Sequence, residues 1–378
     1  MRTWVRHELR WLALPVLLSA IIWCIGLNSS LTEKFYSLGF YPGLSAILRW
    51  LSGKVSFAAG DFIYLFLVGI LCVSLLRFIR KSWRDRPDKT HLYKAPFKAL
   101  KLILWLYIAF KILWGLNYSR PSVASTLGIS KQGYTADQLT TLGEQLIREV
   151  NTLSAELDQQ KARKAYTVKE LQHGATTAYK NLAARNPLFT YKNPVVKAVL
   201  SQGLINRIGL EGYYCPLSGE ANVNMGLPPV SLPFVTCHEI SHQLGIARED
   251  EANLAGYLAC LNSPDLNFRY AGVYSILRNV LFEIRLIAPE KLEELRNQIN
   301  PATQADYRAE QEFWQKYNGD MSAYMGTALD QFLKINNQTK GVDSYQDIVI
   351  WVYNLQLKDA PALFPAFENS TGYRHKNQ

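Results

Sequence analysis

Long apolar runs dominate the first third of the chain, and short polar stretches separate them. Three of these runs are candidate transmembrane helices, at residues 11–27, 57–76 and 102–116. A helix needs about 17 to 25 predominantly apolar residues to cross a bilayer, so the first two runs are long enough. The third run is shorter and contains Lys111, which leaves a helix on the membrane surface as its alternative. We therefore predict an N-terminal bundle of two to three transmembrane helices.

The pattern changes after residue 117, where apolar side chains recur at the spacing of amphipathic helices. Ala221, Val223 and Met225 alternate with Asn222 and Asn224, the period-two pattern of a half-buried strand. The predicted helices cover about 135–161, 168–184, 233–244, 249–260, 270–287, 303–317, 321–335 and 345–357, and the predicted strand covers 220–225.

These patterns define the predicted fold class and domains. Residues 1–117 form a membrane anchor with up to three transmembrane helices. Residues 118–378 form a mainly α domain with a small β-sheet, an α+β fold, whose polar tail at 367–378 is predicted to be frayed.

The positive charge of the chain belongs to the membrane anchor. The formal net charge is +10, but residues 1–117 hold 16 Lys and Arg against 5 Asp and Glu, whereas residues 118–378 hold 25 against 26. This distribution indicates membrane topology and argues against a nucleic-acid partner. Nine basic residues lie in 77–101 and only three in the loop 28–56. The positive-inside rule then places 77–101 in the cytoplasm, and three spans would deliver the second domain outside the cytoplasmic membrane.

The five cysteines have no zinc-ribbon spacing. Cys237 is next to His238 but points away from the face that would hold a metal, so it is interpreted as a packing residue. A disulfide between Cys215 and Cys260 is left open.

One motif carries recognisable chemistry. His238-Glu239-x-x-His242 lies where Pro233 suits a first helical turn and Gly245 suits the end of a helix. Residues four apart share one face of a helix, so His238 and His242 can bind one metal ion, with Glu239 beside them as a candidate general base. The alternative is a core helix whose histidines only pack or form hydrogen bonds.

A catalytic zinc ion usually has three protein ligands. Glu249 and Glu251 are the candidates for the third, because both begin the next predicted helix. Glu249 is favoured, since Asn253 lies one turn later on its face and can orient a liganding histidine. Glu251 points about 200° away on that helix and is the alternative ligand. An ordinary acidic first turn of a helix would show the same residues.

Two resemblances follow from these residues. The stretch Glu249-x-x-Ala252-Asn253 resembles the Glu-x-x-Ala-Asp/Asn element that follows His-Glu-x-x-His in glutamate-ligand zincin metallopeptidases, although only six residues separate His242 from Glu249. With its apolar helices and Trp114-Gly-Leu-Asn-Tyr118, most of the chain also resembles a bacterial membrane family catalogued as domain of unknown function 3810.

The zincin resemblance implies a zincin-like, membrane-anchored peptidase that binds one Zn²⁺ ion and a peptide or protein substrate. Glu239 would act as general base, and an edge strand before the active helix would pair with substrate, which points to Asn222, Val223 and Asn224. A scaffold strand is equally compatible. Zincins usually add an oxyanion-stabilising residue, for which the candidates are Tyr213, Tyr214 and Tyr345. The alternative function is a catalytically inactive metal-binding membrane protein that acts as a scaffold.

Overall fold

The computed structural model describes residues 2–84 and 90–357 and divides into two compact units. Unit 1 consists of residues 1–121 with the short segment 215–219, and unit 2 consists of 122–214 with 220–378. The sequence gives no sign that 215–219 groups with the N-terminal third. Most of the described chain is helical, with one small sheet. The tail predicted to be frayed, 367–378, lies outside the described residues.

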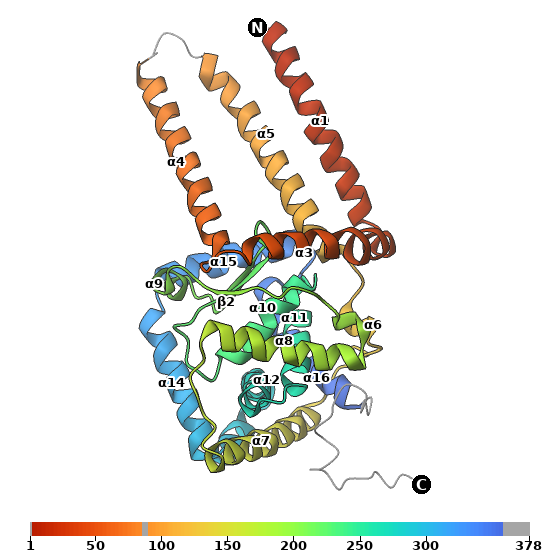
Figure 1. Ribbon diagram of the computed structural model, residues 1–378, viewed down its shortest axis with the longest axis vertical. Helices are drawn as coiled ribbons and strands as arrows, with labels where there is room; N and C mark the ends of the chain where they lie inside the picture. The colour runs from red at the N-terminus through yellow and green to blue at the C-terminus, as the bar shows by residue number, and fades with distance from the viewer. Residues whose placement is uncertain (1, 85–89, 358–378) are drawn as a thin grey trace. The chain divides into compact units, whose positions relative to one another are not determined.

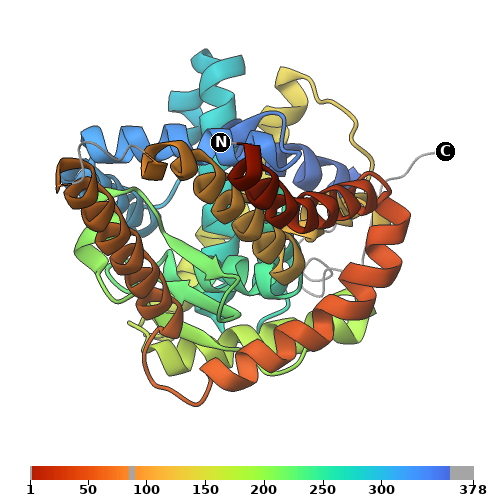
Figure 2. The same cartoon turned by 90° about the horizontal axis from the view of Figure 1, so that it is seen from above.

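Three long helices form much of unit 1: α1 (Arg2–Gly26), α4 (Ala59–Arg84) and α5 (Thr90–Leu113). α1 packs on α5, where Glu8 and Lys101 form an ion pair of 3.0 Å. α4 stands apart from α1 in both ribbon views (Figure 1 and Figure 2). Apart from the contact between α1 and α5, most of the apolar surface of these helices is uncovered in the described structure.

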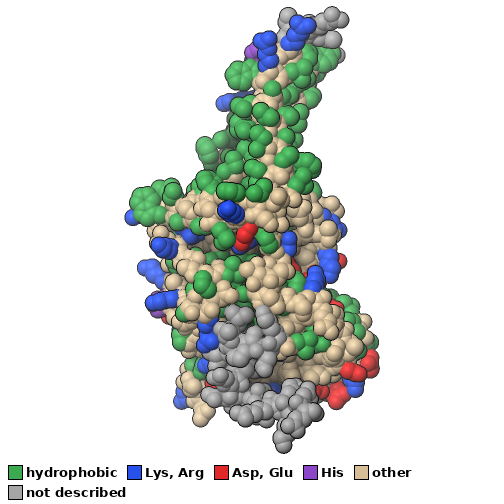
Figure 3. All heavy atoms as spheres, turned by 90° about the vertical axis from the view of Figure 1, so that its right-hand side faces the viewer, with side chains coloured by type: hydrophobic (Ala, Val, Ile, Leu, Met, Phe, Trp, Pro, Cys, Tyr) green, Lys and Arg blue, Asp and Glu red, His purple; other side chains and the backbone are tan. Residues whose placement is uncertain are grey.

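Two helices in the described part of the chain are long and apolar enough to cross a membrane, at Trp4–Gly26 and Ala59–Arg84. Only 17% of the most apolar window of the first is buried, and none of the second. Hydrophobic side chains accordingly cover the long helices in Figure 3. An aqueous solvent disfavours apolar surface of this extent, which supports membrane association. The third predicted span, 102–116, is not among these helices, because α5 also carries Lys98 and Lys101 near Lys111.

The segment 28–56, predicted to be a loop, is helical over most of its length. It forms the short α2 (Ser29–Leu31), the π-helical η1 (Thr32–Phe40) and α3 (Tyr41–Ser52). Pro42 fits this structure because it lies in the first turn of α3, where its missing N–H group costs no hydrogen bond. Unit 1 continues with η2 (Gly115–Ser119), a 3₁₀ helix.

Helix α7 (Ala136–Gln159) and helix α12 (Leu266–Ile287) pack against each other in unit 2. The helix predicted at 135–161 is confirmed. Thr135 accepts a hydrogen bond from the backbone of Gln138, whose side chain accepts one from Thr135 in return, so α7 begins with a capping box. Its apolar stripe, including Leu139, Leu142 and Leu146, is buried. The core of unit 2 is therefore built from helices that the sequence pattern indicates.

The sheet has three strands, β1 (Val196–Ala198), β2 (Gly212–Cys215) and β3 (Glu220–Val223), in the order β1-β3-β2. β3 runs parallel to β1, with Lys197 opposite Asn222. The predicted strand is confirmed, but the expectation that it is an edge strand is wrong. Both of its sides are already hydrogen-bonded to neighbouring strands, so its backbone is not open to pair with a substrate.

All five cysteines of the chain are free thiols, so the possible Cys215–Cys260 disulfide is absent.

The other elements of unit 2 are helical. The remaining elements are α6 (Val123–Thr126), α8 (Val168–Arg185), η3 (Pro187–Phe189), α9 (Gln202–Arg207), α10 (Leu232–Gln243), α11 (Glu249–Leu261), α13 (Pro289–Asn297), α14 (Pro301–Tyr317), α15 (Asp320–Ile335), η4 (Gly341–Asp347) and α16 (Ile348–Leu357).

Candidate metal centre

Helix α10 presents the two histidines of the motif on one face. Pro233 lies in its first turn, and Gly245, with φ +80°, ends it while the Ile246 N–H bonds back to the carbonyl of Ser241 at 3.1 Å. The rings of His238 and His242, one turn apart, have their centroids 4.9 Å from each other. The left-handed turn at Gly245 makes the connection to α11 short enough for the next helix to begin beside them.

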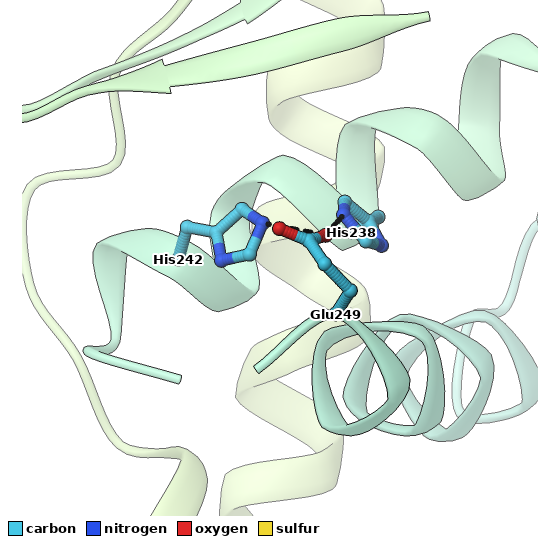
Figure 4. Close-up of side chains that lie close together, drawn as sticks. All are labelled: His238, His242 and Glu249. Carbon is cyan, nitrogen blue, oxygen red and sulfur yellow. Dashed lines mark ion pairs between the residues drawn. The ribbon is translucent and has the colours of Figure 1, made fainter. Parts of the chain in front are cut away.

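The first residue of α11 completes a three-residue cluster. Glu249 Oε2 lies 3.2 Å from His238 Nε2 and 3.5 Å from His242 Nε2. One potential ligand atom from each residue lies within 4.8 Å of the other two, and Figure 4 shows the carboxylate directed between the two rings. Two imidazoles and a carboxylate are the donor set that suits a divalent transition metal such as zinc.

Each ring is fixed through its other nitrogen. His238 Nδ1 lies 2.8 Å from Asn253 Oδ1, and His242 Nδ1 lies 2.7 Å from the carbonyl oxygen of Ile246. A carbonyl oxygen only accepts hydrogen bonds, so Nδ1 carries the proton on His242, and Nε2 is left to face Glu249. The predicted position of Asn253 beside a histidine is therefore observed. The carbonyl of Ile246 has no sequence signal, because every residue has one.

Charge inside the cluster is balanced between acid and imidazole. Burial would raise the pKa of Glu249, but the adjacent His242 and His238 hold it well below its usual range. Burial would lower the pKa of His242, yet the Glu249 carboxylate raises it to about 9. The pocket therefore favours positive charge beside Glu249, whether that charge is a proton or a cation.

Glu239 lies next to the cluster and is 4% exposed. Its Oε2 atom has no hydrogen-bond partner among the described residues. Burial raises the pKa of Glu239 to about 7, with the rings of His238 and His242 opposing that rise. A buried carboxyl group whose pKa is close to neutral can both accept and donate a proton, which is what general acid–base chemistry requires.

Two glycines let neighbouring backbones approach the centre. A Cβ atom on Gly212, in β2, would lie 2.8 Å from Glu239 Oε1, and one on Gly256, in α11, would lie 3.1 Å from the backbone nitrogen of His238. Real Cβ contacts are rarely this close. Gly212 therefore leaves room for the Glu239 carboxylate, and Gly256 allows α11 to cross α10 at the first histidine. The sequence did not predict either glycine, because no recognisable pattern links Gly212 or Gly256 to the motif.

Glu251 faces elsewhere. It accepts a hydrogen bond from the Val123 N–H at 3.1 Å and lies 3.5 Å from Arg248 Nη1. The opposite directions of the two glutamates follow from their spacing of two residues on a helix. The structure brings Glu249, and not Glu251, to the histidines.

The predicted substrate-contacting residues are buried and make contacts within the protein. Val223 is buried in the hydrophobic core, and Asn224 bonds through its side chain to Asn206 and to the backbone of Gly226. The Asn222 amide is buried. With β3 central, the backbone-pairing role proposed for the three residues 222–224 has no open strand edge to act through.

The predicted oxyanion candidates are distributed over two elements. Tyr213 and Tyr214 lie on β2, and Tyr345 lies on η4. Their role stays a prediction.

The model of the family described as "Protein of unknown function (DUF3810)" matches residues 36–353. The chain belongs to this family. The match covers most of the chain, including parts of both units and the whole His238–Asn253 stretch. No curated protein and no solved structure matches the chain. Membership in DUF3810 carries no assigned activity, so the function rests on the geometry of the site.

Proposed function

We propose that this DUF3810 protein is a membrane-anchored, zinc-dependent metallopeptidase. The observation that carries the proposal is the convergence of His238 Nε2, His242 Nε2 and Glu249 Oε2 beside the buried Glu239. A structural zinc site usually has four protein ligands, whereas this cluster offers three and a neighbouring carboxylate. Three ligands and an adjacent base are the combination typical of zinc hydrolases.

The residues fit a zinc ion in their chemistry and in their orientation. His238, His242 and Glu249 would hold it, while Asn253 and the Ile246 carbonyl keep both rings turned toward it. When bound, zinc supplies the positive charge that lowers the pKa of water toward neutrality and polarises a carbonyl group.

Glu239 would carry the proton in this reaction. Its unpartnered Oε2 is the atom that would accept a proton from an attacking water molecule, and the same carboxyl group would pass it to the leaving amine of the peptide. Burial keeps solvent from competing for this oxygen, so the group is held ready for a bound water and substrate.

Zinc content and hydrolysis, measured on the full chain purified in a non-ionic detergent, test the proposal. We expect about one zinc ion per chain in the wild type by mass spectrometry, loss of zinc in Glu249→Ala, and retention in Glu251→Ala. Glu239→Gln should keep zinc and lose cleavage of a mixed peptide library. Wild-type protein that is folded but holds less than about 0.1 zinc per chain would exclude the metal site. Zinc binding without cleavage of any peptide would favour the inactive scaffold instead.

We also propose that the chain crosses the bacterial cytoplasmic membrane and carries the candidate site on its outer side. The proposal rests on the two apolar helices, on the basic segment 77–101 and on the predicted third span 102–116, which must also cross for unit 2 to lie outside. A reporter enzyme active only outside the cytoplasm should be active when fused after residue 120 and silent when fused after residue 94. Silence at both positions would mean that 102–116 does not cross, and it would place unit 2 in the cytoplasm.

A further inference from the structure

A second site is suggested by a cavity of about 890 Å³ on unit 2, whose lining includes none of the residues of the candidate metal centre. Three helices surround it, and each contributes at least one arginine: Arg278 and Arg285 from α12, Arg296 from α13 and Arg308 from α14. This volume is typical of pockets that bind small organic ligands.

The arginines of the cavity are unequally paired. Arg278 forms an ion pair with Glu310, the only acidic residue among those that line the cavity, and lies 3.4 Å from Glu211. For Arg285, Arg296 and Arg308, no carboxylate of the described chain lies within 4.0 Å. These three arginines are exposed at the wall of one hollow, where an anion would offset their like charges.

Apolar side chains form another part of the cavity wall. Phe282, which is 45% exposed, Ile299 and Trp314 line the same hollow as the arginines. A ligand that covers the exposed Phe282 ring removes apolar surface from water, which favours binding. The wall therefore offers a ligand both charge and apolar contact.

We propose that this cavity binds a phosphate ester with an apolar group. Arg296 and Arg308 hold the phosphate, because the planar guanidinium group forms paired hydrogen bonds with phosphate oxygens. Phe282 and Trp314 contact the apolar group. The site goes beyond the proposed peptidase activity and does not depend on it. A lipid headgroup and a soluble phosphate ester share this chemistry.

Calorimetric titration of the full chain in a non-ionic detergent tests the site with three probes: inorganic phosphate, phenyl phosphate and dihexanoyl phosphatidic acid. We expect at least one ester to bind with a Kd below about 1 mM and more tightly than inorganic phosphate. The double variant Arg296→Gln/Arg308→Gln should weaken that binding at least about tenfold. Arg148→Gln, which removes an exposed arginine of α7 outside the cavity, should change it less than about twofold.

The outcomes separate the ligand sources and the failure of the proposal. Tighter binding of dihexanoyl phosphatidic acid assigns a lipid headgroup, whereas tighter binding of phenyl phosphate assigns a soluble aromatic ester. The proposal is overturned if no probe binds at several millimolar, or if Arg148→Gln weakens binding as much as the double variant does. Circular dichroism and zinc content of both variants confirm that the fold and the candidate metal centre are unchanged.

Discussion

The amide oxygen of Asn253 lies 2.8 Å from Nδ1 of His238, one turn after Glu249 on α11. Replacing Asn253 with alanine removes the hydrogen-bond acceptor that holds the His238 ring in place. We expect Asn253→Ala to weaken zinc binding by about 10–100-fold, the usual effect of losing a hydrogen-bond partner of a liganding histidine. Competition against a fluorescent chelator measures this affinity.

Asn253→Asp is the matched control for this prediction. An aspartate keeps an oxygen at the position of Oδ1, so its zinc affinity should stay within about threefold of the wild type or increase. Wild-type affinity in Asn253→Ala would contradict the role of Asn253 in orienting His238.

Gly212 sets the space available to Glu239, the proposed general base. A Cβ atom there would lie 2.8 Å from both Glu239 Oε1 and the carbonyl oxygen of Asn222, so the strand must shift or the carboxylate must turn. We expect Gly212→Ala to lower peptide hydrolysis at least about tenfold, because displacing a catalytic group by about 1 Å costs this much or more. Zinc content should remain near one per chain, since the three ligand side chains are untouched.

A second glycine serves as the control. Gly203 lies in α9, where a Cβ atom would meet only Arg207 Nη1 at 3.8 Å, an ordinary contact. Gly203→Ala should therefore keep wild-type hydrolysis. If Gly212→Ala also keeps full activity, Glu239 does not require the space that Gly212 leaves.

At the scale of elements, the sequence could predict most helices and the core of the candidate metal centre. His238, Glu239, His242, Glu249 and Asn253 are recognisable because two adjacent helices hold them within a short stretch, so spacing alone fixes their relative directions. The helices with regular apolar stripes were predictable for the same reason.

Other features depend on contacts that spacing does not determine. Whether β3 is central or at an edge depends on where β1 and β2 pair with it, and its alternating pattern is the same in both cases. Helix α3 within 28–56 does carry an amphipathic pattern, but the segment lies between two candidate transmembrane runs and is interpreted from the sequence only as their connection. Gly212 reaches Glu239 only through the sheet, and such a distant contact leaves no local pattern.

The α7–α12 packing contains a buried acid with a consequence for stability. Glu149 Oε2 of α7 is buried and has no hydrogen-bond partner among the described residues. Burial raises the pKa of Glu149 to about 7, and the charge of Arg269 only partly opposes this. In the unfolded chain the same group has a pKa near its usual value of about 4.3.

The sign of the effect follows from proton binding. Between about pH 4.5 and 7 the folded state holds a proton that the unfolded state has lost, so the free energy of unfolding falls as the pH rises. The expected loss is about 3 kcal/mol over this window, with no further change from Glu149 above it. Thermal unfolding of the full chain in detergent, at pH 5 and pH 8, measures this difference.

Glu149→Gln should remove this contribution, and the variant should lose less stability than the wild type between the two pH values. Glu144→Gln is the control, because Glu144 lies on the same helix but is 41% exposed. It should leave the pH dependence of the wild type unchanged. Equal pH dependence in the wild type and in Glu149→Gln would show that Glu149 is ionised in the folded state.

At the scale of the whole molecule, exposed apolar side chains occur in two settings. A lysine substitution is expected to lower membrane retention in one setting and to leave it unchanged in the other. On α4, Phe66 is 68% exposed in a helix whose apolar window has no buried residues. On α9 of unit 2, Leu204 is 51% exposed on a short helix with polar neighbours. If α4 is surrounded by lipid, a lysine at position 66 costs about 3 kcal/mol, whereas in water the same change costs little.

We therefore expect Phe66→Lys to lower the amount of protein that resists alkaline carbonate extraction from the membrane fraction. Leu204→Lys should leave that amount at the wild-type level, because its side chain already faces water. Quantitative immunoblots of the membrane pellet and the supernatant measure both variants. Wild-type membrane retention of Phe66→Lys would mean that the surface of α4 around residue 66 is not in the hydrocarbon layer. The apolar surface of α4 would then have to be covered by protein, because water disfavours an uncovered helix of this composition.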